Sequence, residues 1–119
     1  INYRNYNDEI VELINALKEF GADVLAIKCD VSKSNEVENF VSEIKNHFSS
    51  IDILVNNAGI LDHGTAAIDS VKDEDINAVI DINAKGTIYF TREVAKVMAE
   101  QKSGAIVNTA SVAMGEQLM

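Results

Sequence analysis

The chain has 119 residues, of which 47% are hydrophobic, and its formal net charge is −9. That length allows one domain at most, and the hydrophobic content is ordinary for a globular protein. The acidic charge argues against nucleic acid or an anionic membrane as a partner, because either would require a basic face. No apolar run approaches the roughly 20 residues of a membrane span. We therefore expect a cytoplasmic protein with neither of these partners.

Residues that commonly bind metals are scarce. The sequence holds one cysteine, Cys29, and two histidines, His47 and His63, which are too few for a zinc site. Cys29 follows an apolar run and is expected to be a small buried side chain. We therefore expect no metal site and no intrachain disulfide.

The first predicted elements are the end of a strand and a helix. Residues 1–3 resemble the end of a strand, and Asn7 is suited to cap a helix that carries Asp8 and Glu9 in its first turn. Gly21 supplies the C-terminal stop. Apolar residues at helical spacing predict a surface helix packed on a sheet. Its buried stripe is expected to comprise Ile10, Leu13, Ile14 and Leu17.

Strands and helices then alternate with short links. An apolar strand is predicted at residues 24–29, and a second helix opens at Ser32 or Ser34. The apolar run that begins the stretch 51–56 is too short for a helix and too continuous for a half-exposed strand. We therefore expect a strand buried on both faces of a parallel sheet. This alternation predicts an α/β fold, a Rossmann-type doubly wound parallel sheet that occupies residues 1–119 as one partial domain.

Two amides and two small residues end that central strand. The side chains of Asn56 and Asn57 can tie neighbouring groups together, and Ala58 and Gly59 leave room for a flat ligand. Ligands bind at the carboxyl edge of open α/β sheets, near the point where strand order reverses. From these four residues alone, an Asn-rich turn is the alternative interpretation.

A long helix is predicted at residues 73–101, and the weak helix formers Asn83 and Gly86 interrupt its middle. We expect a local kink or a freed carbonyl there, with close packing at Gly86 as the alternative. The helix carries two apolar faces, which one sheet cannot cover, so we expect a homo-oligomer formed through it. A final strand at residues 104–111 ends in Ser111. The two faces are expected to hold Ile76, Ile80, Thr87, Phe90, Val94 and Met98, and Val79, Ile82, Tyr89 and Val97.

Four of these elements together resemble the short-chain dehydrogenase/reductase family. They are Asp30 with Val31, the Asn-Asn-Ala-Gly motif at residues 56–59, Asn83 in the long helix, and the strand that ends in Ser111. The match covers essentially the whole chain, and its ordered set of motifs is specific. Within the family the chain is most similar to the compact NADP-linked reductases typified by β-ketoacyl-acyl carrier protein reductase.

The resemblance implies an NADP(H)-dependent oxidoreductase that interconverts a small-molecule ketone and a secondary alcohol by hydride transfer. Ser111 would hydrogen-bond the substrate oxygen, and the backbone carbonyl of Asn83 would hold a water in a proton relay. Arg4 would grip a 2′-phosphate, which favours NADP(H) over NAD(H); a solvated surface charge is the alternative for Arg4. The implied catalytic residues are Ser111 and Asn83, and the implied cofactor-binding residues are Arg4, Asp30, Val31, Asn57, Ala58 and Gly59.

Two motifs of the family are absent from the sequence. One is the Gly-rich strand-to-helix turn that holds a pyrophosphate, and the other is Tyr-x-x-x-Lys, whose tyrosine is the general acid/base. The family's first strand belongs between residues 1–3 and residues 51–56, so its absence leaves a gap of roughly 10 Å. We expect either that these residues are the central segment of a longer enzyme, inactive alone, or that another chain fills the gap.

Two rival interpretations remain. A non-catalytic nucleotide-binding or scaffold protein would keep the fold and lose the chemistry. A flavodoxin-like receiver module is disfavoured, because Asp30 has no clustered acidic neighbours to bind a metal.

Overall fold

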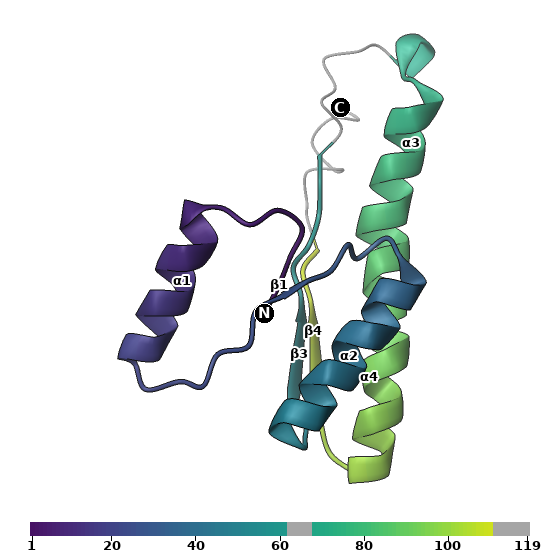
Figure 1. Cartoon of the computed structure of the whole chain (residues 1–119). Coiled ribbons are helices and arrows are strands. Elements are labelled where there is room, and N and C mark those ends of the chain that lie inside the picture. Colours follow the sequence, from purple (N-terminus) through teal and green to yellow (C-terminus); the bar gives the residue numbers. More distant parts are fainter. Residues whose placement is uncertain (62–67, 111–119) are drawn as a thin grey trace.

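The computed structural model describes residues 1–61 and 68–110 (Figure 1). Among these residues, no helix is both long and apolar enough to cross a membrane. In chain order the elements are β1 (Asn2–Tyr3), α1 (Asp8–Glu19), β2 (Ile27–Lys28), α2 (Ser34–Phe48), β3 (Ile53–Asn56), the 3-10 turn η1 (Ile68–Ser70), α3 (Asp73–Val79), the π-helical segment η2 (Ile80–Gly86), α4 (Thr87–Gln101) and β4 (Ala105–Asn108).

The strands form two separate parallel pairs. β1 pairs with β2, where Asn2 lies opposite Ile27, and β3 pairs with β4, where Leu54 lies opposite Ile106. The predicted parallel α/β architecture is therefore confirmed, and so is the interruption between the first strand and the central one. The described strands make an incomplete doubly wound sheet.

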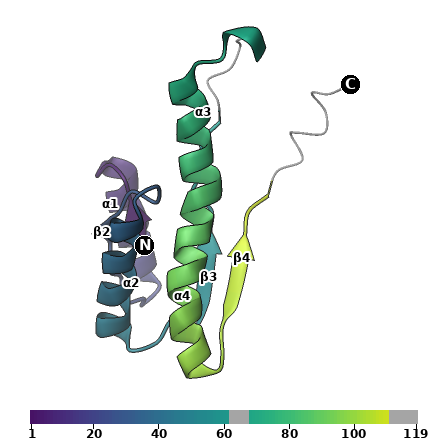
Figure 2. The same cartoon turned by 90° about the vertical axis from the view of Figure 1, so that its right-hand side faces the viewer.

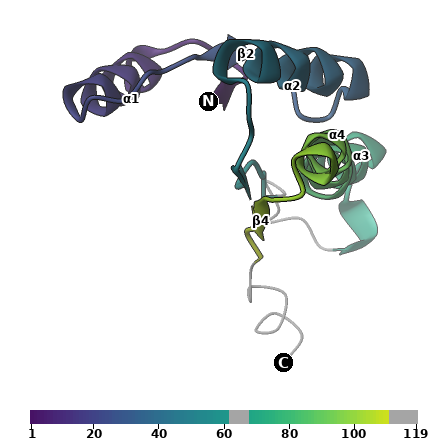
Figure 3. The same cartoon turned by 90° about the horizontal axis from the view of Figure 1, so that it is seen from below.

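The core lies between α2 and α4, which Figures 2 and 3 show side by side. Apolar residues recur at three- and four-residue spacing on both helices, so each presents one stripe to the other. The rings of Phe40 and Phe90 meet edge to face with centroids 5.4 Å apart, and Leu54 of β3 packs against the cluster. Its buried members are Cys29, Val31, Val37, Val41, Phe90, Val94, Val97 and Met98.

Cys29 is buried, as predicted, with 1% of its surface exposed. Burial raises the pKa of the Cys29 thiol to about 11, and the negative charges of Glu36 and Asp30 act in the same direction. The thiol is therefore neutral at physiological pH, and it packs as a small apolar group.

Helix α1 has the predicted ends but not the predicted packing. The Asn7 side chain accepts a hydrogen bond from the Ile10 amide at 3.0 Å, and Gly21 has φ +83° just after the helix. However, none of the helix residues is buried, and Leu13 is 45% exposed. Figures 1 and 3 show α1 standing away from α2 and α4. A sheet of two residues per strand is too small to cover its apolar stripe.

The strand predicted at residues 24–29 is shorter in the structure. Only Ile27–Lys28 forms ladder pairs, because β1 offers just two residues as partners. The following helix does begin at Ser34, as predicted, but no side chain caps it, and its N-cap is Lys33. Ser32 bonds to Asp30 instead.

The prediction that the central strand is buried on both faces is wrong. Ile53 and Val55 of β3 are 68% and 59% exposed, whereas Leu54 packs on the core. Val107, paired with Val55, is also 52% exposed on the same face. Among residues 1–61 and 68–110, nothing covers this face, because α2 and α4 both pack against the other.

The predicted interruption of the long helix is confirmed. Residues 80–86 form the π-helical segment η2, which contains both Asn83 and Gly86. Gly86 is buried, and a Cβ added to it would lie 2.7 Å from Cγ2 of Val31. The irregular helical turn and the close packing at Gly86, which the sequence analysis treated as alternatives, are therefore both present.

The two predicted faces of the long helix are not kept apart. Val97, expected on the second face, is buried together with Phe90, Val94 and Met98 from the first. The part of the first face near α3 is open to solvent, since Ile76 and Ile80 are each about half exposed. A homo-oligomer through this helix stays a prediction.

The substitution Gly86→Ala is expected to destabilise the protein by about 1–3 kcal/mol, because a Cβ would be forced against Val31 in a filled site. The better helix propensity of alanine, about 1 kcal/mol, acts in the opposite direction. Urea unfolding measures the net change in the free energy of unfolding. In a Val31→Ala background the penalty should be smaller, because the contact with Cγ2 is removed while those with Cβ and the carbonyl oxygen of residue 31 remain. A Gly86→Ala protein more stable than the parent would contradict the close approach.

Candidate functional site

A cavity of about 370 Å³ lies where β1, β2 and β3 reach their carboxyl ends. Each strand contributes the residues that directly follow it, because parallel strands bring their ends to one edge. All six residues predicted to bind a cofactor line this cavity. They are Arg4 after β1, Asp30 and Val31 after β2, and Asn57, Ala58 and Gly59 after β3.

The backbone amide, the backbone carbonyl and one carboxylate oxygen of Asp30 are all hydrogen-bonded. Its amide donates to Oε2 of Glu36 at 2.8 Å, and its carbonyl accepts from the Lys33 amide at 3.0 Å. Oδ1 accepts from both the amide and the hydroxyl of Ser32, at 3.0 and 2.7 Å. Within the described part of the chain, Oδ2 has no such partner. Asp30 therefore presents one fixed acceptor to the cavity.

The charge state of Asp30 follows from competing effects. Burial raises the pKa of its carboxyl group, but the two hydrogen bonds from Ser32 and the positive charges of Arg4 and Lys33 outweigh burial and lower it. The group is ionised at neutral pH, and an ionised carboxylate only accepts hydrogen bonds. A ligand group facing Oδ2 must therefore be a donor, such as an exocyclic amine.

Arg4 supplies positive charge at the opening of the same site. Its side chain is exposed and bonds to none of the described residues. A wider hollow of about 840 Å³ continues from the cavity, and its charged lining residues are Arg4, Lys33, Asp30, Asp75 and Asp81. The hollow as a whole is therefore not basic, and the guanidinium of Arg4 is the group whose fork matches a phosphate.

The amide pair that ends β3 is bound to distant elements rather than forming a simple turn. Nδ2 of Asn56 donates to Oδ1 of Asn108 at 2.9 Å and to Oγ1 of Thr91 at 3.2 Å. Oδ1 of Asn57 accepts from the hydroxyl of Thr109 at 3.0 Å. These bonds join β3 to α4 and to the end of β4, which fixes the strand end beside the cavity.

Asn83 is joined to the loop that follows the Asn-Asn-Ala-Gly motif. Its Oδ1 accepts from the Ile60 amide at 2.8 Å, and its Nδ2 donates to the Ile60 carbonyl at 2.7 Å. The backbone carbonyl of Asn83 accepts from the Thr87 hydroxyl at 3.3 Å. The π-helical segment thus brings Asn83 to the site edge, while Ser111 lies outside the described residues.

Some residues of the site were not singled out from the sequence. Ser32 and Glu36 hydrogen-bond Asp30, and Lys33 lies beside it. The backbone of Ile60 hydrogen-bonds the side chain of Asn83. The spacing of Asp30 and Ser32 is a recognisable signal, because an Asp side chain commonly bonds the backbone two residues later. Within residues 1–61 and 68–110, no group of three metal-binding side chains gathers.

Comparison with known proteins agrees with this geometry. The family model described as short chain dehydrogenase matches residues 1–118. The 3-oxoacyl-(acyl-carrier-protein) reductase FabG of Staphylococcus epidermidis is 35% identical over 117 residues, which cover 97% of this chain and 47% of that protein. The chain thus spans about half the length of the curated relatives it matches.

Two solved structures share the fold. A metagenomic short-chain oxidoreductase in complex with NADP aligns with a TM-score of 0.86 and 25% identity, over 93% of this chain and 49% of that one. The NADH-dependent reductase A1-R′, responsible for alginate metabolism, aligns with a TM-score of 0.82 and 26% identity, over 95% and 48%. The two neighbours differ in the cofactor that their titles name.

The substitution Asn83→Ala is expected to speed hydrogen exchange of the Ile60 amide, because its acceptor is removed, and to destabilise the protein by about 1 kcal/mol. Nuclear magnetic resonance measures the exchange at single amides. Asn77→Ala, at an exposed position of α3 without a side-chain partner, is the matched control. Unchanged exchange at Ile60 would show that the bond to Asn83 does not hold the loop.

Ser32→Ala is expected to raise the pKa of Asp30, because the carboxylate loses a donor. The folded pKa lies below the unfolded value of about 3.9. The stability that Asp30 contributes is therefore present above about pH 4 and lost as the pH falls through the folded pKa. Urea unfolding should show a larger cost of Ser32→Ala at about pH 7 than at about pH 2. The exposed Ser42→Ala should show no such difference, and equal costs for Ser32→Ala would contradict the expectation.

Proposed function

Because the chain belongs to the short-chain dehydrogenase family, we propose that it forms part of an NADP(H)-dependent oxidoreductase that interconverts a ketone and a secondary alcohol. One observation carries the proposal: residues from three strand ends, Arg4, Asp30 and Asn57 among them, line one cavity. The reductase activity in the names of the relatives supports the oxidoreductase class. The NADP complex of one structural neighbour supports a nicotinamide cofactor, as does the NADH dependence of the other.

The residues present fit the adenine and ribose end of such a cofactor. Oδ2 of Asp30 accepts a hydrogen bond from the adenine amino group, and Val31 lies beside the ring. Arg4, with Lys33 nearby, binds the 2′-phosphate, which is the basis for preferring NADP(H) to NAD(H). When bound, the nicotinamide supplies or receives the hydride. The Gly-rich turn that would hold the pyrophosphate is not found in these 119 residues.

On the catalytic side we assign two residues. Ser111 donates a hydrogen bond to the substrate oxygen and stabilises the charge that develops there. The side chain of Asn83 holds the loop at Ile60, and its backbone carbonyl orients a water for proton transfer. The sequence holds no Tyr-x-x-x-Lys, so the proton donor must come from other residues, and the 119-residue chain alone is inactive. The 3-oxoacyl group in the name of the staphylococcal relative is a ketone of the proposed class.

The cofactor assignment is tested in the full-length protein that carries this segment. Arg4→Ala is expected to raise KM for NADPH about tenfold, a loss of about 1.4 kcal/mol, and to leave KM for NADH within about twofold, because only NADPH carries the 2′-phosphate. Lys18→Ala on α1 is the control, since it removes a cation remote from the cavity. Equal changes for both cofactors would refute the role of Arg4.

The enzyme is distinguished from its rival, a nucleotide-binding scaffold, by turnover. The full-length protein should oxidise NADPH in the presence of ketone substrates, whereas the purified 119-residue chain should not. A full-length protein that binds NADPH without any turnover would favour the scaffold.

A further inference from the structure

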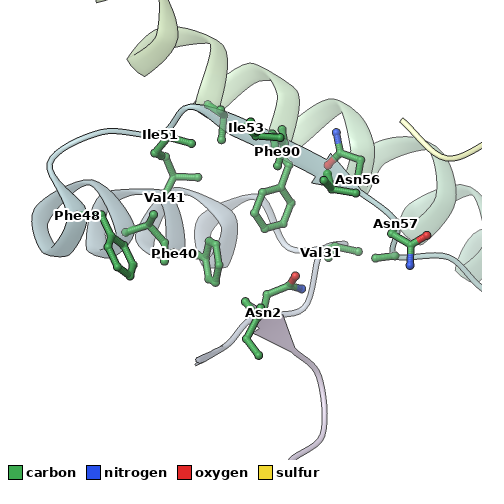
Figure 4. A pocket seen from close by; sticks show the side chains of 16 residues that line it. Asn2, Val31, Phe40, Val41, Phe48, Ile51, Ile53, Asn56, Asn57 and Phe90 are labelled. Carbon is green, nitrogen blue, oxygen red and sulfur yellow. The ribbon is translucent and has the colours of Figure 1, made fainter. Parts of the chain in front are cut away.

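The neighbours of Asp30 fix its position but not its orientation. Cys29 before it and Val31 after it are both buried, with 1% and 8% of their surfaces exposed. Val31 lines a cavity of about 330 Å³ together with Phe90 of the core (Figure 4). The residues on either side of Asp30 are therefore held by packing. The peptide group between residues 29 and 30 can still turn about its flanking bonds, because only rotation about the amide bond itself is restricted.

The amide of Asp30 faces the outer edge of β2. The Cys29 amide donates to the Tyr3 carbonyl on the β1 side at 2.9 Å, and successive residues of a strand direct their backbone groups to opposite edges. In the described part of the chain β2 pairs only with β1, so no strand offers the Asp30 amide an acceptor. A side chain does so instead, through Oε2 of Glu36 at 2.8 Å.

Glu36 belongs to the well-packed part of the structure. It lies in the first turn of α2 beside β2, and the next residue, Val37, is fully buried in the core. In a capping box, a glutamate at this third helical position bonds to the amide of the N-cap residue. Here the amide of the N-cap residue, Lys33, donates to the Asp30 carbonyl. Glu36 bonds to the Asp30 amide instead, so both backbone groups of Asp30 are joined to the start of α2.

The bond to Glu36 is the strongest contact of this peptide group. A hydrogen bond from an amide to a carboxylate is charge-assisted and about twice as strong as a neutral one. At the other end of the peptide, the Cys29 carbonyl accepts from Nδ2 of Asn2 at 3.5 Å, a length beyond the ordinary range. Asp30 also bonds within its own turn, but those partners turn with it. Glu36 therefore ties the orientation of Asp30 to the helix.

We propose that Glu36 is a positioning residue that makes the cofactor site selective for its base. With the peptide group held, Oδ2 of Asp30 accepts from a donor at one place only, which is the exocyclic amino group of adenine. This inference rests on the proposed function, because it requires that Asp30 contacts the adenine ring. Without Glu36 the peptide turns, and the carboxylate follows a donor placed elsewhere on the base. The selectivity thus depends on a side chain that does not line the cavity.

Hypoxanthine is the base that tests this selectivity. It carries a carbonyl oxygen where adenine carries its amino group, and its donor is the ring N–H next to that carbon. Against a fixed Oδ2 of Asp30, the carbonyl oxygen leaves two acceptors facing each other, and neither finds a donor. An acceptor that is free to turn reaches the ring N–H and recovers the bond.

The test compares NADPH with its analogue that carries hypoxanthine in place of adenine, both bound to the full-length protein that carries this segment. Isothermal titration calorimetry without substrate gives the dissociation constants, so no turnover is needed. The parent should bind NADPH at least about tenfold more tightly than the analogue. Glu36→Ala should bring the two dissociation constants within about twofold of each other, chiefly by weakening NADPH.

Further variants separate the position of the acceptor from its charge. Glu36→Gln keeps an acceptor of the same reach and should keep most of the selectivity. Glu36→Asp keeps the charge but is one methylene shorter, so it should lower the selectivity. Glu38→Ala is the matched control, because this glutamate is exposed on the same helix, and the parent ratio should be unchanged.

The outcomes distinguish this inference from the proposed function. A full-length protein that does not bind NADPH, or that binds both compounds equally, overturns the contact of Asp30 with adenine and this inference with it. A selective parent whose ratio is unchanged in Glu36→Ala and Glu36→Asp overturns the role of Glu36 alone, since both compounds are then weakened equally or not at all.

Hydrogen exchange gives a second readout that requires no cofactor. In the full-length protein, the Asp30 amide should exchange faster in Glu36→Ala than in the parent or in Glu36→Gln, because its acceptor is removed. The Val94 amide, within α4, is the internal reference. Equal exchange of the Asp30 amide in all three proteins would contradict the role of Glu36.

Discussion

The contact between α2 and α4 is the interaction on which the other elements depend. Val37 and Val41 of one helix and Phe90 and Val94 of the other are at most 5% exposed. Burying an aliphatic or aromatic side chain of this size contributes about 1.5–3 kcal/mol. Because β3 packs on this cluster through Leu54, the helix pair also sets the position of the strand end that carries the amides.

The same core couples two parts of the candidate site. Val31 follows Asp30 directly and is buried in the cluster, and its side chain fills the space that a Cβ at Gly86 would need. Gly86 closes the π-helical segment that carries Asn83 to the loop at Ile60. The edge of the cavity at Val31 and the helical segment that holds Asn83 therefore share one packing contact.

The exposed apolar surfaces of the structure have one cause, which is the division of the sheet into two strand pairs. The side chains of Ile53 and Val55 are exposed, and Asp52 and Asn56 on either side of them bond to the β4 side. Unpaired strand edges and exposed apolar faces favour association with other chains. Helix α1 belongs to the same pattern, since the short β1 and β2 pair cannot cover its apolar stripe. Completion of the sheet would relieve these features together.

Local features of the sequence were sufficient to predict the alternation of strands and helices, the ends of α1 at Asn7 and Gly21, the break at Asn83 and Gly86, and the residues that gather at the strand ends. These follow from local rules of periodicity, capping and glycine conformation, together with one topological rule about parallel strands. The burial of individual side chains could not be predicted from such local rules. Leu54 is covered whereas Ile53 and Val55 are not, and Val97 joins the face of Phe90, because burial depends on which layers are present around an element. Likewise, the bonds between Asp30 and Glu36 and between Asn83 and Ile60 could be found only in the tertiary structure, because these partners are set by distances that no spacing in the sequence encodes. The bond between Asp30 and Ser32 is different, because it follows a local spacing that the sequence shows.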